Sequence, residues 1–178
     1  MNIPLDLTLL ARIDLLILDV DGVLTDGKII LTPGGDEIKE FHVRDGAGMK
    51  YWRQAGKKLA VITGRGSPAV SRRLADLGVD AYRMQAADKV PALRSVLAEL
   101  NIAADRAAVI GDDLPDLPLL KTCALPIAVA DAVPELHEAA KYITKLPGGH
   151  GAVREAIEMI LRPTGHWAKI VERYSQIL

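Results

Sequence analysis

The sequence predicts an α/β fold in which helices cover both faces of a parallel β-sheet, a doubly wound arrangement. Short apolar runs alternate with stretches that have the spacing of amphipathic helices through the body of the chain, and this alternation is typical of parallel sheets. The apolar runs are continuous, as expected for strands buried on both faces. Because 178 residues suit one domain with a sizeable core, we expect a single domain over residues 1–178.

The composition excludes several classes of protein. Apolar residues make up 49% and charged residues 25% of the chain, which is ordinary for a globular protein. A formal net charge of -1 gives no basic footprint for nucleic acid. No apolar run is long enough to cross a membrane, and the first residues lack the features of a signal peptide. Cys123 is the only cysteine, which suits a reducing compartment, so we expect a cytoplasmic protein.

The first strand and the segment after it contain the most distinctive pattern. The apolar run Leu15-Leu16-Ile17-Leu18 predicts a buried strand over residues 13–19. Two β-rich runs then flank the turn Pro33-Gly34-Gly35, which predicts a β-hairpin insertion over about residues 27–43. A lone hairpin is marginal in water, so it needs the parent domain or another copy of the chain to pack against. Its apolar residues are Ile29, Ile30, Leu31, Ile38, Phe41 and Val43.

Helices and strands alternate along the rest of the chain. Asp45, Ser67 and Asp88 favour the N-cap position, so we expect each to begin a helix. Gly56 and Gly78 would end the first two of these helices. Further strands are expected at 58–62, 79–82, 107–110, 124–129 and near 142–144, with further helices after residue 116, from residue 134 and over 151–161, before a tail of about 162–178.

Polar residues follow three predicted strands at the point where each ends. Asp19 and Asp21 are two residues apart, so an extended chain places both side chains on one face, while Thr63 and the pair Asp112-Asp113 follow two other strands. Parallel strands end at one edge of the sheet, where these residues can meet. Carboxylates held close together need a cation or a proton, and Mg²⁺ prefers carboxylate and phosphate oxygens. With Lys89 as a further donor, the pattern predicts Mg²⁺-dependent phosphoryl transfer.

The ordered set of motifs resembles the haloacid dehalogenase superfamily of phosphohydrolases over almost the whole body of the chain. Each motif is common alone, but the ordered set is specific. The four motifs are Asp19-Val20-Asp21-Gly22-Val23, Val61-Ile62-Thr63-Gly64-Arg65, Lys89 and Gly111-Asp112-Asp113-x-x-Asp116. The resemblance implies a Rossmann-like fold and an enzyme that works through an aspartyl-phosphate intermediate.

The resemblance also implies a role for each motif residue. Asp19 would be the nucleophile, and Asp21 would act first as general acid and then as general base. Thr63 and Lys89 would hold the transferring phosphoryl group.

A Mg²⁺ site is implied in the same way. Its ligands would be the carboxylates of Asp19 and Asp112 and the backbone carbonyl of Asp21, while Asp113 would position Lys89 or a metal-bound water. Asp116 could instead cap the local helix, so its role is open.

Within this superfamily the chain is most similar to a small branch without a mobile cap domain, which removes phosphate from 3-deoxy-D-manno-octulosonate (KDO) 8-phosphate in lipopolysaccharide biosynthesis. The branch implies a homotetramer in which hairpins close the active sites. Substrate contacts are expected from Gly64, Arg65, His42 and Arg44, in addition to Asp21, Thr63 and Lys89. The tail after residue 161 departs from the family, and its role is open. The motifs of the branch are Asp19-Val20-Asp21-Gly22-Val23-Leu24-Thr25-Asp26-Gly27, Phe41-His42-Val43-Arg44-Asp45-Gly46 and Gly148-Gly149-x-Gly151-Ala152-Val153-Arg154-Glu155.

Two other functions stay open at this point. A phosphatase for another sugar-acid phosphate, such as an acylneuraminate 9-phosphate, would differ only in the residues that face the sugar. A phospho-accepting regulatory domain also places acidic residues, a threonine and a lysine around Mg²⁺. Asp21 argues against the regulatory domain, because a general acid is needed for turnover and not for signalling.

Overall fold

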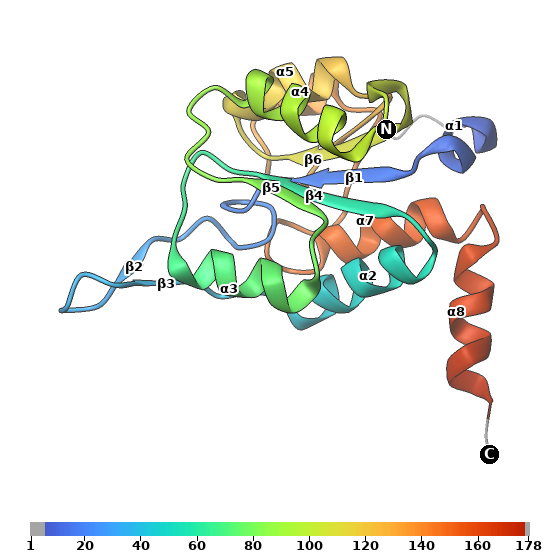
Figure 1. Cartoon of the computed structure of the whole chain (residues 1–178), viewed down its shortest axis with the longest axis horizontal. Coiled ribbons are helices and arrows are strands. Elements are labelled where there is room, and N and C mark those ends of the chain that lie inside the picture. Colours follow the sequence, from blue (N-terminus) through green and yellow to red (C-terminus); the bar gives the residue numbers. More distant parts are fainter. Residues whose placement is uncertain (1–5, 177–178) are drawn as a thin grey trace.

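The computed structural model describes residues 6–176, and within them one parallel sheet has the strand order β5-β4-β1-β6-β7-β8 (Figure 1). All of its neighbouring strands run in the same direction, so the predicted doubly wound sheet is confirmed. The strands are β1 (Leu15–Leu18), β4 (Lys58–Ile62), β5 (Ala81–Arg83), β6 (Ala107–Gly111), β7 (Leu125–Ala128) and β8 (Tyr142–Ile143).

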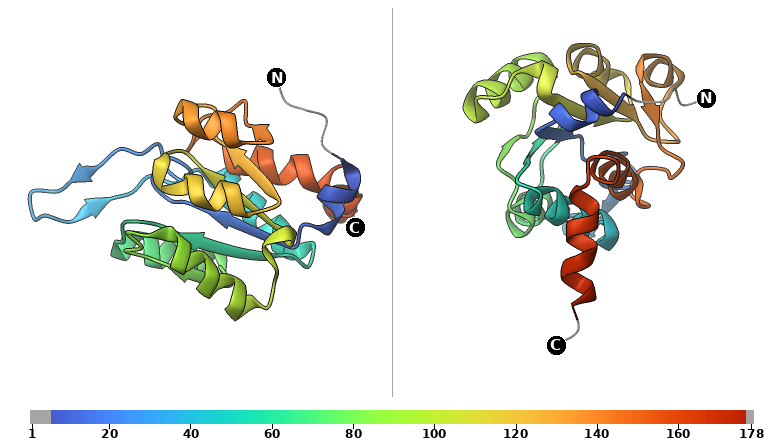
Figure 2. Two further views of the ribbon diagram at one scale, coloured as in Figure 1. Left: turned by 90° about the horizontal axis from the view of Figure 1, so that it is seen from above. Right: turned by 90° about the vertical axis from the view of Figure 1, so that its right-hand side faces the viewer.

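Helices cover both faces of this sheet (Figures 1 and 2). The residues of β1 are wholly buried in the middle of the sheet, which agrees with their continuous apolar run. On one face lie α2 (Val43–Gln54), α3 (Pro68–Leu77) and α7 (Ala152–Leu161), and on the other lie α4 (Lys89–Leu100), α5 (Leu117–Thr122) and α6 (Pro134–Ala139). None of the helices within residues 6–176 combines the length and hydropathy needed to cross a bilayer.

The predicted caps of α3 and α4 are confirmed. The Ser67 side chain accepts a hydrogen bond from the backbone N–H of Val70, and the Asp88 side chain accepts one from that of Val90. Gly78 ends α3 in the left-handed conformation at φ 66°, which glycine adopts without strain. Because these caps involve neighbours in the sequence, local patterns were sufficient to find them.

Asp45 does not begin the second helix, contrary to the sequence prediction. Helix α2 begins at Val43 with His42 at the N-cap, and Asp45 is only 1% exposed. Its carboxylate accepts hydrogen bonds from the backbone N–H groups of Gly151 and Arg154, at 3.2 and 2.7 Å. Asp45 therefore satisfies donors at the start of α7, a helix far along the chain.

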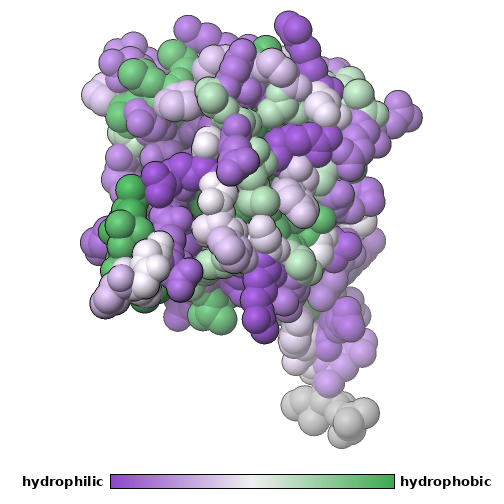
Figure 3. Space-filling view, turned by 60° about the vertical axis from the view of Figure 1, so that its left-hand side comes forward, coloured by the Kyte–Doolittle hydropathy of each residue, from purple (hydrophilic) through white to green (hydrophobic). Residues whose placement is uncertain are grey.

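Two short strands, β2 (Ile30–Leu31) and β3 (Glu37–Ile38), pair antiparallel in the segment after β1. The pairing is shorter than the two predicted runs, and the hairpin extends from the side toward which the sheet strands point (Figure 1). Hydrophobic side chains lie on this side of the molecule (Figure 3). The exposed fractions are 56% for Ile29, 42% for Ile30, 65% for Leu31 and 50% for Ile38.

Phe41 and Val43 belong to the body of the protein, not to the apolar ribbon predicted from the sequence. Phe41 is partly buried against the core, and the Arg73 guanidinium lies 5.6 Å from the centre of its ring. Val43 is the first residue of α2 and is 77% exposed.

The tail forms a helix, α8 (His166–Ser175), which projects from the body (Figure 2). Trp167 and Ile170 are buried and attach it to the domain. The Trp167 ring packs edge-on against Tyr51 of α2 at 5.7 Å, and the Arg154 guanidinium lies 4.8 Å from the Trp167 ring centre. At the other end of the chain, helix α1 (Leu7–Arg12) contributes the core residue Leu10.

Candidate active site

A cavity of about 210 Å³ opens where β1, β4 and β6 end at the carboxyl edge of the sheet. This is the position where open α/β sheets place their ligands. The cavity brings together the residues of all four predicted motifs. It is lined by Asp19, Asp21, Thr63, Gly64, Arg65, Lys89, Asp112, Asp113, Pro115 and Asp116.

A buried lysine joins two carboxylates at the bottom of this cavity. The Lys89 ammonium donates to Asp19 Oδ1 at 2.8 Å and to Asp116 Oδ1 at 2.6 Å. Each of these side chains is at most 8% exposed. Although burial opposes the charge of Lys89, Asp19 and Asp116 raise its pKa. Lys89 is thus held as an ammonium beside the carboxylate at the end of β1.

The acidic cluster fits a hard divalent cation. One carboxylate oxygen from each of Asp19, Asp112 and Asp116 lies within 4.8 Å of the others. Burial, together with the neighbouring carboxylates, raises the pKa of Asp19 to about 6 and that of Asp112 to about 8, while Lys89 opposes both shifts. A cation would offset this repulsion, and oxygen donors are those that Mg²⁺ prefers.

Two glycines allow the loops of the site to approach closely. Gly22 has a φ of +94°, and a Cβ there would lie 2.0 Å from Oδ2 of Asp112. A Cβ at Gly148 would lie 1.7 Å from the carbonyl oxygen of Gly22. A larger residue at position 22 would displace the Asp112 side chain, and one at position 148 would push its loop away from the loop after β1, so glycine suits both positions.

Asp116 makes the contact with Lys89 that the sequence interpretation expected from Asp113. Oδ2 of Asp116 also accepts from the backbone N–H of Asp112 at 3.3 Å. Asp113 is exposed, and its carboxylate accepts from the backbone N–H of Leu114 at 2.7 Å. Asp113 therefore caps the short 3₁₀ turn Leu114–Asp116, and the acceptors of Lys89 among the described residues are Asp19 and Asp116. That Asp113 positions a metal-bound water stays a prediction.

Asp21 is held by cations on both oxygens. Lys39, which directly follows β3, donates to its Oδ1, and Nε of Arg65 lies 3.7 Å from its Oδ2. Although burial opposes the charge, Asp21 and Glu37 raise the pKa of Lys39. Sequence reasoning missed Lys39. A sequence signal for Lys39 was its spacing from Glu37. Residues two apart on an extended strand share a face, so the two charged side chains are expected to lie side by side.

Thr63 and Arg65 border the cavity in different ways. Thr63 is buried, and its hydroxyl oxygen accepts from the backbone N–H of Arg65 at 3.3 Å, which fixes the turn after β4. The Arg65 side chain is 51% exposed and donates to Glu37 at 3.0 Å. Gly64, between them, also lines the cavity.

His42 and Arg44 do not line the cavity that contains Asp19. They line a second cavity of about 560 Å³ with Leu146, His150, Gly151, Arg154, Glu155 and Glu158. Of the described residues that line these two cavities, none is shared by both. The expectation that His42 and Arg44 contact the substrate stays a prediction.

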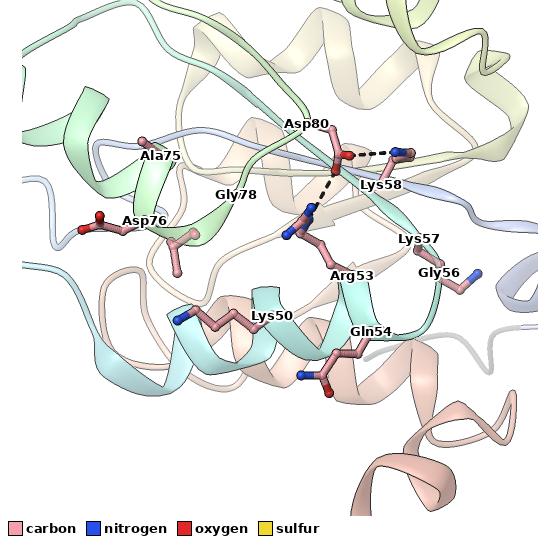
Figure 4. Close-up of a pocket in the computed structure, with 11 residues that line it drawn as sticks. Lys50, Arg53, Gln54, Gly56, Lys57, Lys58, Ala75, Asp76, Gly78 and Asp80 are labelled. Carbon is pink, nitrogen blue, oxygen red and sulfur yellow. Dashed lines mark hydrogen bonds and ion pairs between the residues drawn. The ribbon is translucent and has the colours of Figure 1, made fainter.

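A further cavity, of about 510 Å³, lies between α2 and α3 (Figure 4). Arg53 and Lys58 point to Asp80 there, at 3.7 and 2.8 Å. Of its two acidic residues, Asp80 pairs with these cations and Asp76 points away from them (Figure 4), so the lining does not form the carboxylate cluster found at the carboxyl edge.

Comparison with known proteins identifies the class of enzyme that has this sheet and this acidic edge. Residues 84–157 match the haloacid dehalogenase-like hydrolases. The chain is 41% identical over 156 residues to the KDO 8-phosphate phosphatase of Haemophilus influenzae, covering 88% of this chain and 87% of that protein. It is 43% identical over 154 residues to the same phosphatase of Escherichia coli K12, covering 86% and 82%.

Solved structures show the same relationship. A KDO 8-phosphate phosphatase from Moraxella catarrhalis, in complex with magnesium, phosphate and KDO, matches with a TM-score of 0.92 and 37% identity, over 95% of this chain and 97% of that one. The corresponding phosphatase of Yersinia pestis matches with a TM-score of 0.88 and 40% identity, over 91% and 88%. The chain belongs to the KDO 8-phosphate phosphatase family of haloacid dehalogenase-like hydrolases. The resemblance predicted from the motifs is confirmed.

Proposed function

We propose that this enzyme is a Mg²⁺-dependent phosphatase that hydrolyses KDO 8-phosphate to KDO and phosphate. The observation that carries the proposal is the Asp19 carboxylate, which ends the central strand, is held by Lys89 and lies within a cluster of acidic oxygens. The M. catarrhalis relative, with magnesium, phosphate and KDO, supports the choice of substrate and ion.

In the first step of the proposed reaction, Asp19 attacks phosphorus and the bond to the sugar oxygen breaks. Lys89 fixes one oxygen of the Asp19 carboxylate, which orients the group for attack. Asp21 gives a proton to the departing sugar oxygen, so KDO leaves as an alcohol and the phosphoryl group stays on Asp19.

In the second step, Asp21 takes a proton from the water that attacks phosphorus, and Asp19 is released as a carboxylate with free phosphate. Lys89 and Thr63 would donate hydrogen bonds to the phosphoryl oxygens in both steps. Asp19, Asp112 and the Asp21 backbone carbonyl are the proposed Mg²⁺ ligands, and the ion would neutralise developing phosphoryl charge. Asp116 is a further oxygen donor within the same cluster.

The proposal extends to the assembly. The exposed apolar residues of the hairpin support a homotetramer formed through it, because such surface is normally covered in solution. His42 and Arg44 lie beside the base of this hairpin, and we propose that they contact the sugar across the subunit boundary. We also propose that the chain is a single domain and that it works in the cytoplasm. The location is supported by the only cysteine, Cys123, which is buried and unpaired, as suits a reducing compartment.

The test is phosphate release from KDO 8-phosphate, an acylneuraminate 9-phosphate and p-nitrophenyl phosphate, each with Mg²⁺ and with a chelator. We expect kcat/KM to be highest for KDO 8-phosphate and activity to vanish with the chelator. Asp19→Asn protein is the matched control for contaminating phosphatases. Preference for the acylneuraminate ester would replace the substrate, and stable phosphorylation without turnover would favour a regulatory domain.

A further inference from the structure

We propose that Lys39 is the positioning residue for Asp21: this hairpin lysine fixes the carboxylate that exchanges protons with the leaving group and the attacking water. The inference rests on the proposed function, because it takes Asp21 as the general acid and base. It assigns to the hairpin a role inside its own subunit, separate from any role in assembly.

Asp21 and three other charged side chains form a closed ring. Lys39 donates to Asp21 Oδ1 and lies 3.0 Å from Oε1 of Glu37. Arg65 donates to the same Glu37 oxygen at 3.0 Å and approaches Asp21 Oδ2 at 3.7 Å. Acidic and basic groups therefore alternate around the ring, and each carboxylate contacts two cations.

The members of this ion-pair ring come from three separate segments. Asp21 lies in the loop after β1, Glu37 and Lys39 come from the second arm of the hairpin, and Arg65 lies in the loop after β4. The ring thus ties the hairpin to two of the strand ends that form the cavity. A displacement of the hairpin would reach Asp21 directly.

Because Lys39 is buried, it is placed to hold Asp21 and not to bind the substrate. The Lys39 side chain is 1% exposed, whereas that of Asp21 is 20% exposed. Asp21 lines the cavity and Lys39 does not. The lysine therefore contacts the proton-transferring group from outside the cavity lining, where it can orient the carboxylate without touching the substrate.

Orientation matters here because Asp21 serves two transfers in sequence. A misplacement of about 1 Å at a reacting group can cost about 10²-fold in rate. Without Lys39, one oxygen of Asp21 would lose its donor, and the carboxylate would rely on the longer contact with exposed Arg65. Both proton transfers should slow, while the nucleophile Asp19, which Lys89 holds, should keep its place.

The experiment compares Lys39→Met with Lys39→Arg and with Lys28→Met. Lys28 lies at the base of the same hairpin, is 74% exposed and pairs only with Asp26 among the ion pairs of the described residues. We expect Lys39→Met to lower kcat on KDO 8-phosphate by about 10- to 100-fold, with KM changed less than about twofold. Lys39→Arg should recover part of this loss, and Lys28→Met should match the unmodified enzyme.

A second substrate separates positioning from general damage. p-Nitrophenolate leaves without a proton, so Lys39→Met should still transfer the phosphoryl group to Asp19 in a fast first turnover. Hydrolysis of the phosphoenzyme needs Asp21 as base, so a burst of about one equivalent of p-nitrophenolate should precede slow turnover. Loss of the burst together with turnover would overturn the proposal, since it would mean that the whole site is disturbed.

A double-mutant cycle completes the test. If Lys39 acts through Asp21, adding Lys39→Met to Asp21→Asn should change kcat by less than about twofold. A full second loss would overturn the proposal, as would a Lys39→Met enzyme with unchanged kcat on the sugar phosphate. Glu37→Gln provides a gentler variant and should show the same burst with a smaller loss. If KDO 8-phosphate is not hydrolysed, the substrate assignment fails, but the p-nitrophenyl phosphate burst still tests Lys39.

Discussion

The edge of the sheet and the hairpin beside it contribute to one site by different physical means. At the sheet edge, Asp19, Lys89 and Asp116 are buried, and β1 and β6, which precede Asp19 and Asp116, are each paired on both sides. In the hairpin, two residue pairs form the whole ladder, and the apolar side chains face solvent. The first region is buried within the chain, whereas the second exposes apolar surface that a partner subunit would cover in the proposed tetramer.

The two regions therefore suit different tasks: the sheet edge holds the reacting groups, and the hairpin adjusts their positions. A phosphoryl acceptor has to be rigid and preorganised, and a buried strand end provides that. A hairpin with little pairing opens more easily, since few contacts hold it. Lys39 and Glu37 connect the two regions, because they join the hairpin to Asp21. The predictions below test whether the rigid region fixes the reaction and the hairpin adjusts it.

The largest effect should come from the rigid region. Asp19→Asn removes the phosphoryl acceptor, so kcat should fall by at least about a thousandfold on every phosphate ester. The measurement is steady-state phosphate release, with mass spectrometry to exclude deamidation back to aspartate. A variant that retained a tenth of the original activity would require another nucleophile.

The next prediction separates two carboxylates of the same cavity. Asp21→Asn should lower kcat by about 10²- to 10⁴-fold, the usual range for general acid–base catalysis, with Mg²⁺ binding nearly unchanged. Asp112→Ala should weaken Mg²⁺ binding first, so excess Mg²⁺ should restore part of its activity. Metal titrations of the two proteins distinguish these roles, and similar titration curves would contradict the assignment.

The free energy of unfolding should depend more on the sheet than on the hairpin. Leu16 is wholly buried in β1, so Leu16→Ala should lower the free energy of unfolding by about 2–5 kcal/mol. Leu31 in β2 is 65% exposed, and Leu31→Ala should cost less than about 0.5 kcal/mol in dilute protein. Urea unfolding measures both. A cost at Leu31 that grows with protein concentration would report burial between subunits.

Sequence reasoning predicted those features whose causes are local. Continuous apolar runs located β1, β4 and β6, and the capping preferences of Ser67 and Asp88 located two helix starts. The motif residues also gathered at one edge as expected, because parallel strands must end there.

The features that it missed depend on distant partners. Asp45 has the chemistry of an N-cap, but its carboxylate accepts from Gly151, 106 residues later along the chain, at the N-cap of α7. Asp116 reaches Lys89 across 27 residues, and Lys39 reaches Asp21 across 18. A sequence pattern gives the type of each side chain but not its neighbours in space.

The smallest effect on turnover should come from the hairpin surface. Ile30 and Ile38 face each other across the two strands, so Ile30→Lys with Ile38→Glu keeps a favourable cross-strand pair while it removes apolar surface. Phe41 is unsuitable for this test, because it packs against the core.

This double variant should dissociate the proposed tetramer in light scattering and lower kcat/KM on KDO 8-phosphate by about tenfold, because the site loses part of its wall. Hydrolysis of p-nitrophenyl phosphate should suffer less, since the small ester needs less of that wall. Ile30→Val with Ile38→Val is the matched control and should stay assembled. A charged variant that remained tetrameric with unchanged kinetics would show that the hairpin is not the subunit contact. Dissociation without any kinetic change would show that the sheet edge forms a complete active site without the partner subunits.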